Sequence, residues 1–295
     1  MSQTQTIGDF LEWSRCPVCD GGERAEYVGF SALTFSRCAS CSAVYKSKEA
    51  RGLLPAGFYE QGYFQGRKSG RDQRFERRVR KAMGEIADGL NEVKNARSVL
   101  DVGCSLGYVL EAGRRLGLQS AGVDISEHAV KVCRERGFTA HVGTLDALPF
   151  ADGCFDLVVM KHVLEHTPQP QVALSEVRRV LGPGGAVVIA VPNVDYWKGD
   201  KRRSDYRYYR PDDLGAQHYV YYSEDTLRTR LLRSGFEVVV FGKTRLRQAL
   251  ARRSVWWAAV EPMRAWAWRL GRAVGQNFKL QREVYVVARR GPDAG

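Results

Sequence analysis

The 295-residue sequence lacks any apolar run close to the roughly 20 residues that a membrane-spanning helix needs. Its first residues, MSQTQTIGDFLEWSR, lack the basic segment and the apolar segment that together form a secretory signal. No internal repeat and no low-complexity tract is present. We therefore expect a globular, cytoplasmic protein without a transmembrane segment, and its 44% hydrophobic content is enough to build a buried core.

Acidic residues are in the minority. The chain has 33 Asp and Glu residues against 45 Lys and Arg residues, which gives a formal net charge of +12. Such a balance favours an anionic partner, for example a nucleic acid, a nucleotide-linked substrate or a membrane surface. The net charge alone does not choose among these three classes of partner.

A disulfide framework is not expected, because the seven cysteines are an odd number and no secretory signal precedes them. Four of the seven form two pairs, Cys16-Pro-Val-Cys19 and Cys38-Ala-Ser-Cys41, separated by eighteen residues. This spacing is typical of a four-thiolate zinc ribbon, and the intervening residues predict two short strands. Since four thiolates complete the coordination of the ion, we expect a structural zinc in a ribbon over residues 1–50.

Residues 51–96 follow the predicted ribbon as an aromatic, glycine-containing linker and a basic helix. Five apolar residues recur at spacings of three or four, which indicates a helix with one packed face. They are Phe75, Val79, Met83, Ile86 and Leu90. The Lys and Arg residues lie mostly off that face, so they form either a solvated surface or an anion-binding surface.

From residue 97 onward, short apolar runs alternate with helix-length segments. The segments between the first five runs mostly end at glycine, as helices often do. The runs are SVLDVG, SAGVDI, TAHVGT, FDLVVM, AVVIAV, FEVVVF and EVYVVARR. Alternation of strands and helices predicts an α/β fold with a doubly wound, mostly parallel sheet, here of seven strands. We assign this fold to residues 97–295.

The loop after the first run contains Asp101, Gly103 and Gly107 at the transition from strand to helix. A dinucleotide-binding loop has three glycines there, and the second lets the backbone approach a pyrophosphate. Ser105 and Tyr108 occupy the second and third of those positions. The loop therefore favours a smaller polar ligand that is held by backbone groups and one carboxylate.

On these residues the chain resembles the class I S-adenosylmethionine-dependent methyltransferases, whose Rossmann-like fold has a sheet of this kind. The resemblance runs from about 97 to 192, with further agreement at 218–241 and 283–290. VLDVGCSLG resembles the loop that lies under the methionine part of the cofactor, and Asp124 matches the acidic residue that hydrogen-bonds the ribose hydroxyls. Thr144 stands where many relatives have an Asp that contacts adenine.

The resemblance implies S-adenosylmethionine as the cofactor. Attack on its methyl carbon requires the nucleophile, the carbon and the sulfur to be aligned in a dry pocket. A base is needed only if the nucleophile must lose a proton, as a hydroxyl must. The residues that the resemblance assigns to cofactor binding are Asp101, Gly103, Cys104, Gly107, Asp124, Ile125, Thr144, Leu145, Asp146 and Lys161.

Three histidines are candidates for that base. His162 and His166 flank Glu165 in MKHVLEHTPQP, after the fourth predicted strand, where open α/β sheets bind ligands. In the ubiquinone-pathway O-methyltransferases, which this stretch resembles, a Glu stands at position 162 and the acidic residues have been associated with a divalent metal. One carboxylate with two imidazoles is a poorer Mg²⁺ site, so His166 is interpreted as a base or as a structural residue. His218 is a further candidate for the base, or a structural residue.

Two acceptor-side insertions are predicted, at 193–222 and 243–280. The first holds six basic residues and three tyrosines between 198 and 210, a combination that suits a nucleic acid, a nucleotide-linked sugar or a solvated lid. The second holds four tryptophans at 255–268, which favours a packed lid, a dimer face or a membrane interface. HYVYYSEDTLRTRLLRSGF, beginning at 218, resembles a segment of methyltransferases that act on sugars, glycans and small metabolites.

The sequence thus predicts a methyltransferase that modifies a hydroxyl of an anionic or hydroxylated small-molecule, sugar or glycan acceptor. Because a dimer face is one interpretation of the tryptophan-rich segment, a homodimer is compatible with the sequence. Two alternatives also stay open: an RNA methyltransferase that uses the basic and aromatic surface, and a sugar C-methyltransferase. A non-enzymatic RNA-binding protein with this fold would have lost the ability to bind the cofactor. The main cofactor-binding residues are present in this sequence, namely Asp101, Gly103, Gly107 and Asp124.

Overall fold

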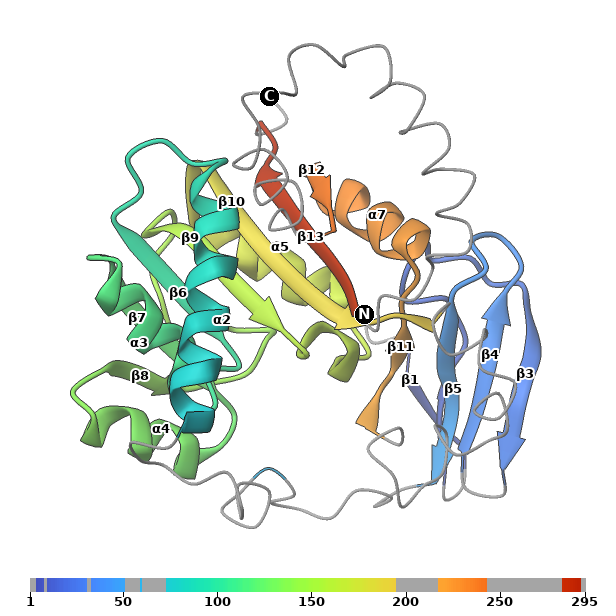
Figure 1. Ribbon diagram of the computed structural model, residues 1–295. Coiled ribbons are helices and arrows are strands. Elements are labelled where there is room, and N and C mark those ends of the chain that lie inside the picture. The colour runs from blue at the N-terminus through green and yellow to red at the C-terminus, as the bar shows by residue number, and fades with distance from the viewer. Residues whose placement is uncertain are drawn as a thin grey trace.

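The computed structural model describes residues 4–7, 10–30, 33–50, 59, 73–194, 217–242 and 283–292. These residues form two sheets, a larger one with helices on both faces and a smaller one from the N-terminal part of the chain (Figure 1). The basic and tryptophan-rich insertions at 198–210 and 255–268 lie outside the described residues, as does the aromatic linker except for Tyr59. Within the described ranges, no helix is both long enough and apolar enough to span a bilayer.

The larger sheet has seven strands in the order β12-β13-β10-β9-β6-β7-β8. They are β6 (Ser98–Val102), β7 (Gln119–Asp124), β8 (Thr139–Val142), β9 (Phe155–Lys161), β10 (Leu181–Pro192), β12 (Phe236–Phe241) and β13 (Glu283–Arg290). Neighbouring strands are parallel except at β13, which runs antiparallel to both β10 and β12. This arrangement confirms the predicted doubly wound, mostly parallel, seven-stranded sheet.

Helices cover both faces of this sheet. They are α2 (Gln73–Leu90), α3 (Tyr108–Arg115), α4 (Glu127–Glu135), α5 (Pro170–Val180) and α7 (Glu224–Arg233), with the short 3-10 helix η1 (Leu164–His166) after β9. Val159 of β9 packs with Val79 of α2 on one face. Its neighbour Val158 packs with Leu174 of α5 on the other face, because successive side chains of a strand point in opposite directions.

Helix α2 confirms the packed face that the sequence predicts for the basic segment. Val79 and Ile86 are fully buried. Phe75, Met83 and Leu90 are partly buried and pack against the same cluster. The exposed residues of this helix include Arg74, Arg77, Arg78 and Arg80.

The smaller sheet carries the cysteines and has the strand order β1-β2-β5-β4-β3, with antiparallel neighbours. Its strands are β1 (Thr4–Ile7), β2 (Phe10–Trp13), β3 (Arg24–Phe30), β4 (Leu33–Cys38) and β5 (Val44–Ala50). Strands β3 and β4 lie between the two cysteine pairs, where the sequence predicts two short strands. A sixth strand, β11 (Val220–Tyr221), pairs with β5. We call these six strands, with the cysteine turns, the cysteine-clipped sheet.

The two sheets share one hydrophobic core. Cys16, Val18 and Tyr45 of the cysteine-clipped sheet belong to the same buried cluster as Leu164 beside the larger sheet. Nη1 of Arg230 in α7 donates a hydrogen bond to the carbonyl oxygen of Val18 at 3.2 Å. The cysteine-clipped sheet therefore packs against η1 and α7, which lie beside the larger sheet.

Candidate functional site

A pocket of about 1160 Å³ opens at the carboxyl ends of strands β6, β7 and β9. Open α/β sheets bind ligands at this edge. Of the ten residues that the sequence assigns to the cofactor, nine line the pocket, and Gly107 is the exception. All three candidate histidines, His162, His166 and His218, line the same pocket. The structure thus brings the two predicted sets of residues together.

Two glycines shape the loop between β6 and α3. Gly103 has a φ of 76° and Gly107 has a φ of 81°, a left-handed conformation that residues with a Cβ rarely adopt. A Cβ on Gly103 would also overlap the side chain of Val163 in the loop after β9. The backbone N–H groups of Gly103 and Cys104 donate to the carbonyl oxygen of Val123 at 2.8 and 3.0 Å, which fixes the loop on β7.

Asp124 ends strand β7 and lies in the wall of the pocket. Its Oδ2 accepts a hydrogen bond from the N–H of Ser105 at 2.8 Å, and its Oδ1 accepts one from the N–H of Ser126 at 2.9 Å. A carboxylate has about four acceptor positions, so Asp124 can also accept hydrogen bonds from the hydroxyl groups of a ligand. Ile125 beside it is 50% exposed and gives a flat apolar group a surface to pack on. These residues fit the ribose and adenine of S-adenosylmethionine.

Asp101 and Lys161 lie close to an acidic residue of α2. Asp101 is buried, and burial raises its pKa well above the ordinary value although the charge of Lys161 opposes this shift. Nζ of Lys161 lies 2.7 Å from Oε2 of Glu85, which is also buried. An ion pair with α2 therefore holds Lys161, and its contact with the cofactor stays a prediction.

His162 is positively charged at neutral pH. It follows β9 with a left-handed φ of 53°. Its Nδ1 lies 3.4 Å from Oε1 of Glu165, and its Nε2 lies 3.3 Å from Oε1 of Glu283. Partial burial disfavours the charged ring, but the two carboxylates outweigh it and raise the pKa of His162 to about 9.

His166 ends η1 and has a defined tautomer. Its Nδ1 lies 3.2 Å from the carbonyl oxygen of Gln217 and 3.3 Å from the hydroxyl oxygen of Tyr59. Because a carbonyl oxygen only accepts, Nδ1 carries the hydrogen and Nε2 carries the lone pair of the neutral ring. Oε1 of Glu165 lies 4.0 Å from Nε2.

His218 is the most deeply buried of the three histidines, with 8% of its surface exposed. Its ring centroid lies 4.8 Å from that of His166, and its Nδ1 has no hydrogen-bond partner in the described part of the chain. Burial lowers the pKa of His218 to about 3, so this ring is neutral at physiological pH. Burial alone would favour a neutral Glu165, but the contact with the charged ring of His162 is the largest opposing effect, and the pKa of Glu165 is lowered overall.

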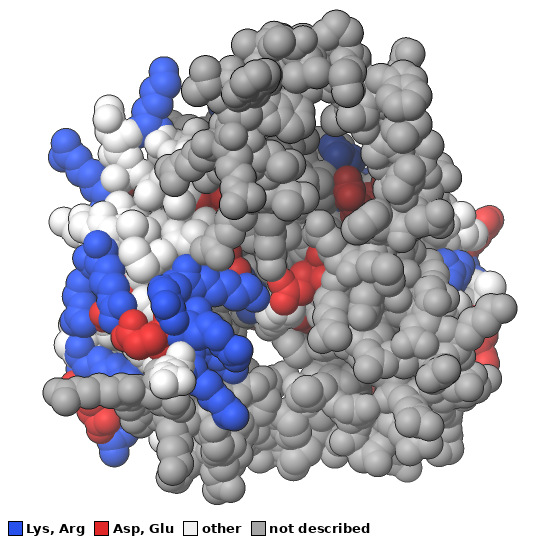
Figure 2. All heavy atoms as spheres, in the orientation of Figure 1, with Lys and Arg blue, Asp and Glu red and all other residues white. Residues whose placement is uncertain are grey.

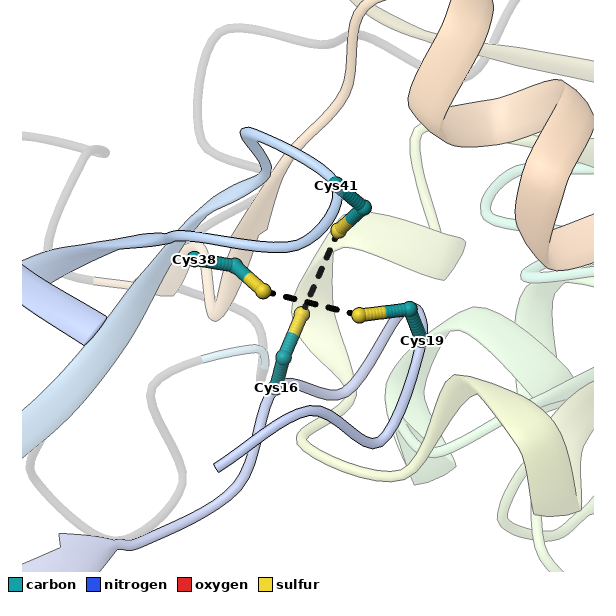
Figure 3. A group of neighbouring side chains, drawn as sticks. All are labelled: Cys16, Cys19, Cys38 and Cys41. Carbon is teal, nitrogen blue, oxygen red and sulfur yellow. Dashed lines mark hydrogen bonds between the residues drawn. The ribbon is translucent and has the colours of Figure 1, made fainter. Parts of the chain in front are cut away.

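The four cysteines of the predicted ribbon come together at one end of the cysteine-clipped sheet (Figure 3). Sγ of Cys16 lies 3.6 Å from Sγ of Cys41, and Sγ of Cys19 lies 3.5 Å from Sγ of Cys38. Thiolates bound to a tetrahedral zinc at about 2.3 Å lie about 3.8 Å from one another, so the cluster has the size of such a site. The four cysteines are therefore consistent with a structural zinc.

A second group of potential metal ligands lies in the pocket. Glu165, His166 and His218 each offer one ligand atom, and these atoms lie within 4.8 Å of one another. The sequence places His162 in such a group, whereas the structure places His218 there. Two nitrogen ligands and one oxygen ligand suit Mg²⁺ poorly in either case, because that ion prefers oxygen.

The pocket-lining residues that the sequence does not predict include Tyr59, Gln217, Tyr219 and Glu283. The hydroxyl of Tyr59 donates to Oε1 of Gln217 at 2.8 Å. Glu283 is the partner of His162 described above, and it begins a strand that the sequence identifies only by its apolar residues. Gln217 and Tyr219 stand on either side of His218 in the sequence, and this position next to a candidate base is the signal that could have identified these two residues.

Residues 100–189 match the family model described as a methyltransferase domain. Over 104 residues the chain is 36% identical to the ubiquinone biosynthesis O-methyltransferase of Methylococcus capsulatus. This alignment covers 33% of this chain and 44% of that protein. Over 105 residues it is 31% identical to the ajmaline N-methyltransferase of Rauvolfia serpentina, which covers 32% of this chain and 36% of that protein. The chain thus spans less than half the length of these two relatives.

Solved structures share the fold. The PH0226 protein from Pyrococcus horikoshii OT3 aligns with a TM-score of 0.52 at 17% identity, over 79% of this chain and 99% of that chain. A chain of the complex between the Haloferax volcanii Trm112 methyltransferase activator and a methyltransferase aligns with a TM-score of 0.51 at 20% identity, over 75% and 95%. At these identities the likeness concerns the fold alone.

Three observations agree on the family. The strand order of the larger sheet, the left-handed glycine loop followed by Asp124, and the match over residues 100–189 all belong to one domain. The chain therefore contains a class I S-adenosylmethionine-dependent methyltransferase domain, with a four-cysteine cluster on its N-terminal side that is consistent with a zinc ribbon.

Proposed function

We propose that this protein transfers the methyl group of S-adenosylmethionine to a hydroxyl of a small-molecule, sugar or glycan acceptor. The observation that carries the proposal is one pocket with two chemically different ends. One end has the glycine loop and Asp124, and the other has His162, His166 and His218. The names of the relatives, a ubiquinone biosynthesis O-methyltransferase and an ajmaline N-methyltransferase, support a small-molecule acceptor.

We assign the first end of the pocket to the cofactor. Asp124 would accept the ribose hydroxyls, and the loop from Gly103 to Gly107 would hold the methionine part. The adenine is assigned to Ile125, Thr144, Leu145 and Asp146. Bound there, the cofactor supplies a methyl group on a positively charged sulfur. The chain itself has to hold the acceptor oxygen in line with that group and to exclude water.

A hydroxyl acceptor must lose its proton, and we assign His166 as the base that takes it. His162 already carries a proton at neutral pH, and His218 binds protons too weakly. Nε2 of His166 keeps its lone pair, because the hydrogen on Nδ1 is bound to the carbonyl oxygen of Gln217. The carboxylate of Glu165 would stabilise the imidazolium that forms. His162 and His218 then set the charge around the base.

A methyl-transfer screen tests the proposed function. The intact chain is incubated with methyl-labelled S-adenosylmethionine and three separate acceptor pools: hydroxylated metabolites, nucleotide sugars with glycans, and total RNA. We expect protein-dependent label in one of the first two pools. Label in RNA alone would overturn the proposal.

One surface feature favours the RNA alternative. Lys and Arg side chains gather on the side of the molecule that carries α2 (Figure 2). Two basic residues of that helix, Arg78 and Lys81, also line the pocket. Such residues contact phosphates without regard to sequence, so the same surface suits the phosphates of a nucleotide sugar. A sugar C-methyltransferase would use the same pocket and differs in the atom that receives the methyl group.

A further inference from the structure

We propose that the cysteine-clipped sheet supports the acceptor-side wall of the pocket from behind, and that Tyr219, which lines the pocket just before β11, is a positioning residue held by that sheet. The proposal rests on the proposed function only in naming the histidine end of the pocket the acceptor side. Three sets of contacts carry it. They are the backbone hydrogen bonds of Tyr219, a buried ion pair behind its ring, and the docking of a cysteine turn on α7.

The backbone of Tyr219 connects the cysteine-clipped sheet to the loop that carries the proposed base. On one side, the N–H of Lys46 in β5 donates to the carbonyl oxygen of Tyr219 at 2.8 Å. On the other side, the N–H of Tyr219 donates to the carbonyl oxygen of Glu165 at 2.7 Å. Strand β11 begins at the next residue and continues the pairing with β5. The segment that contacts His166 is therefore anchored on β5.

A buried ion pair lies behind the ring of Tyr219. Nζ of Lys46 lies 2.6 Å from Oε2 of Glu49, and both residues are buried. The hydroxyl of Tyr219 donates to Oε1 of Glu49 at 3.2 Å, and the ammonium group of Lys46 lies 4.0 Å from the centroid of the ring. Removing one member of such a pair leaves the other charge buried without compensation. The two β5 residues thus fix the orientation of a ring that lines the pocket.

The turn that carries the first cysteine pair docks on the same region. Nη1 of Arg230 donates to the carbonyl oxygen of Val18, and Arg230 lies on α7, which begins shortly after β11. Trp13, just before this turn, meets Tyr219 edge-on with the ring centroids 5.3 Å apart. Cys16 and Val18 are both fully buried. An ion that holds the four cysteines together would therefore stabilise the turn, β5 and, through β5, Tyr219.

Other contacts hold the cofactor end of the pocket. The glycine loop is bound to Val123, and Asp124 accepts hydrogen bonds from the N–H groups of Ser105 and Ser126. In Figure 1 the cysteine-clipped sheet lies on the opposite side of the molecule from β7 and β8. Loss of the ion from the cysteines should therefore disturb the acceptor end and spare the cofactor end.

The five histidines of the chain fall into two groups, three that line the acceptor end of the pocket and two that lie outside its lining, on elements that follow or pair with β7. His162, His166 and His218 line the acceptor end, whereas His128 lies on α4 and His141 on β8. We would record the NMR signals of labelled imidazole nitrogens in the intact chain before and after zinc removal by a chelator, and measure S-adenosylhomocysteine affinity by calorimetry. We expect the His166 and His218 signals to shift or disappear, while the His128 and His141 signals and the affinity stay unchanged.

Two results would overturn this proposal. If all five signals stay unchanged, the cysteine-clipped sheet is an independent module that does not shape the pocket. If all five signals change and the affinity for S-adenosylhomocysteine is lost, the sheet supports the whole fold instead of one wall. A zinc-loaded protein that fails to bind S-adenosylhomocysteine contradicts the proposed function instead, and the comparison of the histidine signals still decides the role of the sheet.

Single-residue variants test the contacts that hold Tyr219 without removing the metal. Glu49→Gln breaks the buried pair, and we expect it to shift the His218 signal while the zinc content stays at the wild-type level. Glu12→Gln is the matched control, because Glu12 forms a more exposed pair with Lys48 at 3.5 Å on the same sheet. Tyr219→Phe removes only the hydroxyl contact and gives the same test if Glu49→Gln does not fold. An unchanged His218 signal in a folded variant would contradict the positioning role.

Discussion

Replacing Asp124 by asparagine removes a charge from the pocket wall and keeps the size of the side chain. In the wild-type protein the two carboxylate oxygens accept from the N–H groups of Ser105 at 2.8 Å and Ser126 at 2.9 Å. An amide has one oxygen and one NH₂ group, so it satisfies one of these N–H groups and turns a donor toward the other. It also removes an acceptor position that we assign to a ribose hydroxyl.

The size of the effect follows from these contacts. A hydrogen bond to a charged group contributes about 1.5 to 3 kcal/mol, which corresponds to a fall in S-adenosylmethionine affinity of about 10- to 150-fold. Titration calorimetry measures this change. Asp152→Asn is the matched control, because Asp152 is exposed, pairs with Arg179 and does not line the pocket. Unchanged affinity in an Asp124→Asn protein that unfolds at the wild-type temperature would refute the ribose assignment.

Three further predictions concern the metal, the base and a buried ion pair. Metal analysis should give one zinc ion per chain and none in Cys41→Ser, and zinc retained by the variant would exclude a four-thiolate site. His166→Gln should lower turnover and remove the acidic limb of the pH–rate profile, because the group that accepts the proton is lost; a wild-type profile with near-normal turnover would leave His166 a structural role. Glu85→Gln should lower the free energy of unfolding by about 3 kcal/mol, because it leaves the charge of Lys161 without its buried partner. Urea denaturation checks this value, and an unchanged midpoint would show that the pair does not stabilise the fold.

The strands of the larger sheet, the glycine loop and the cysteine pairs could be predicted because local sequence determines them. In the run LVVM at 157–160 every residue is apolar, as expected of a strand that is buried on both faces. Gly103 and Gly107 adopt left-handed conformations that few other residues tolerate. Each C-x2-C turn brings two sulfurs to one ion by itself. None of these features depends on a distant part of the chain.

The charges of the histidines could not be predicted, because they depend on distant contacts and on burial. His162 keeps its proton partly through Glu283, which lies 121 residues further along the chain. His218 stays neutral because it is buried, and no sequence spacing encodes that burial. The pairing of β11 with β5 is equally remote, since it joins residues 220–221 to residues 44–45. The sequence therefore identifies the candidate bases but does not choose among them.

Methyl transfer to an oxygen atom of a small acceptor is tested most directly with S-adenosylmethionine that carries a carbon-13 methyl group. The intact chain is incubated with this cofactor and the acceptor pool that takes up label. The chemical shift of the transferred methyl carbon then distinguishes attachment to oxygen, nitrogen and carbon. We predict an O-methyl signal in a small-molecule, sugar or glycan product. A C-methyl or N-methyl signal, or label retained only in RNA, would contradict the proposed function.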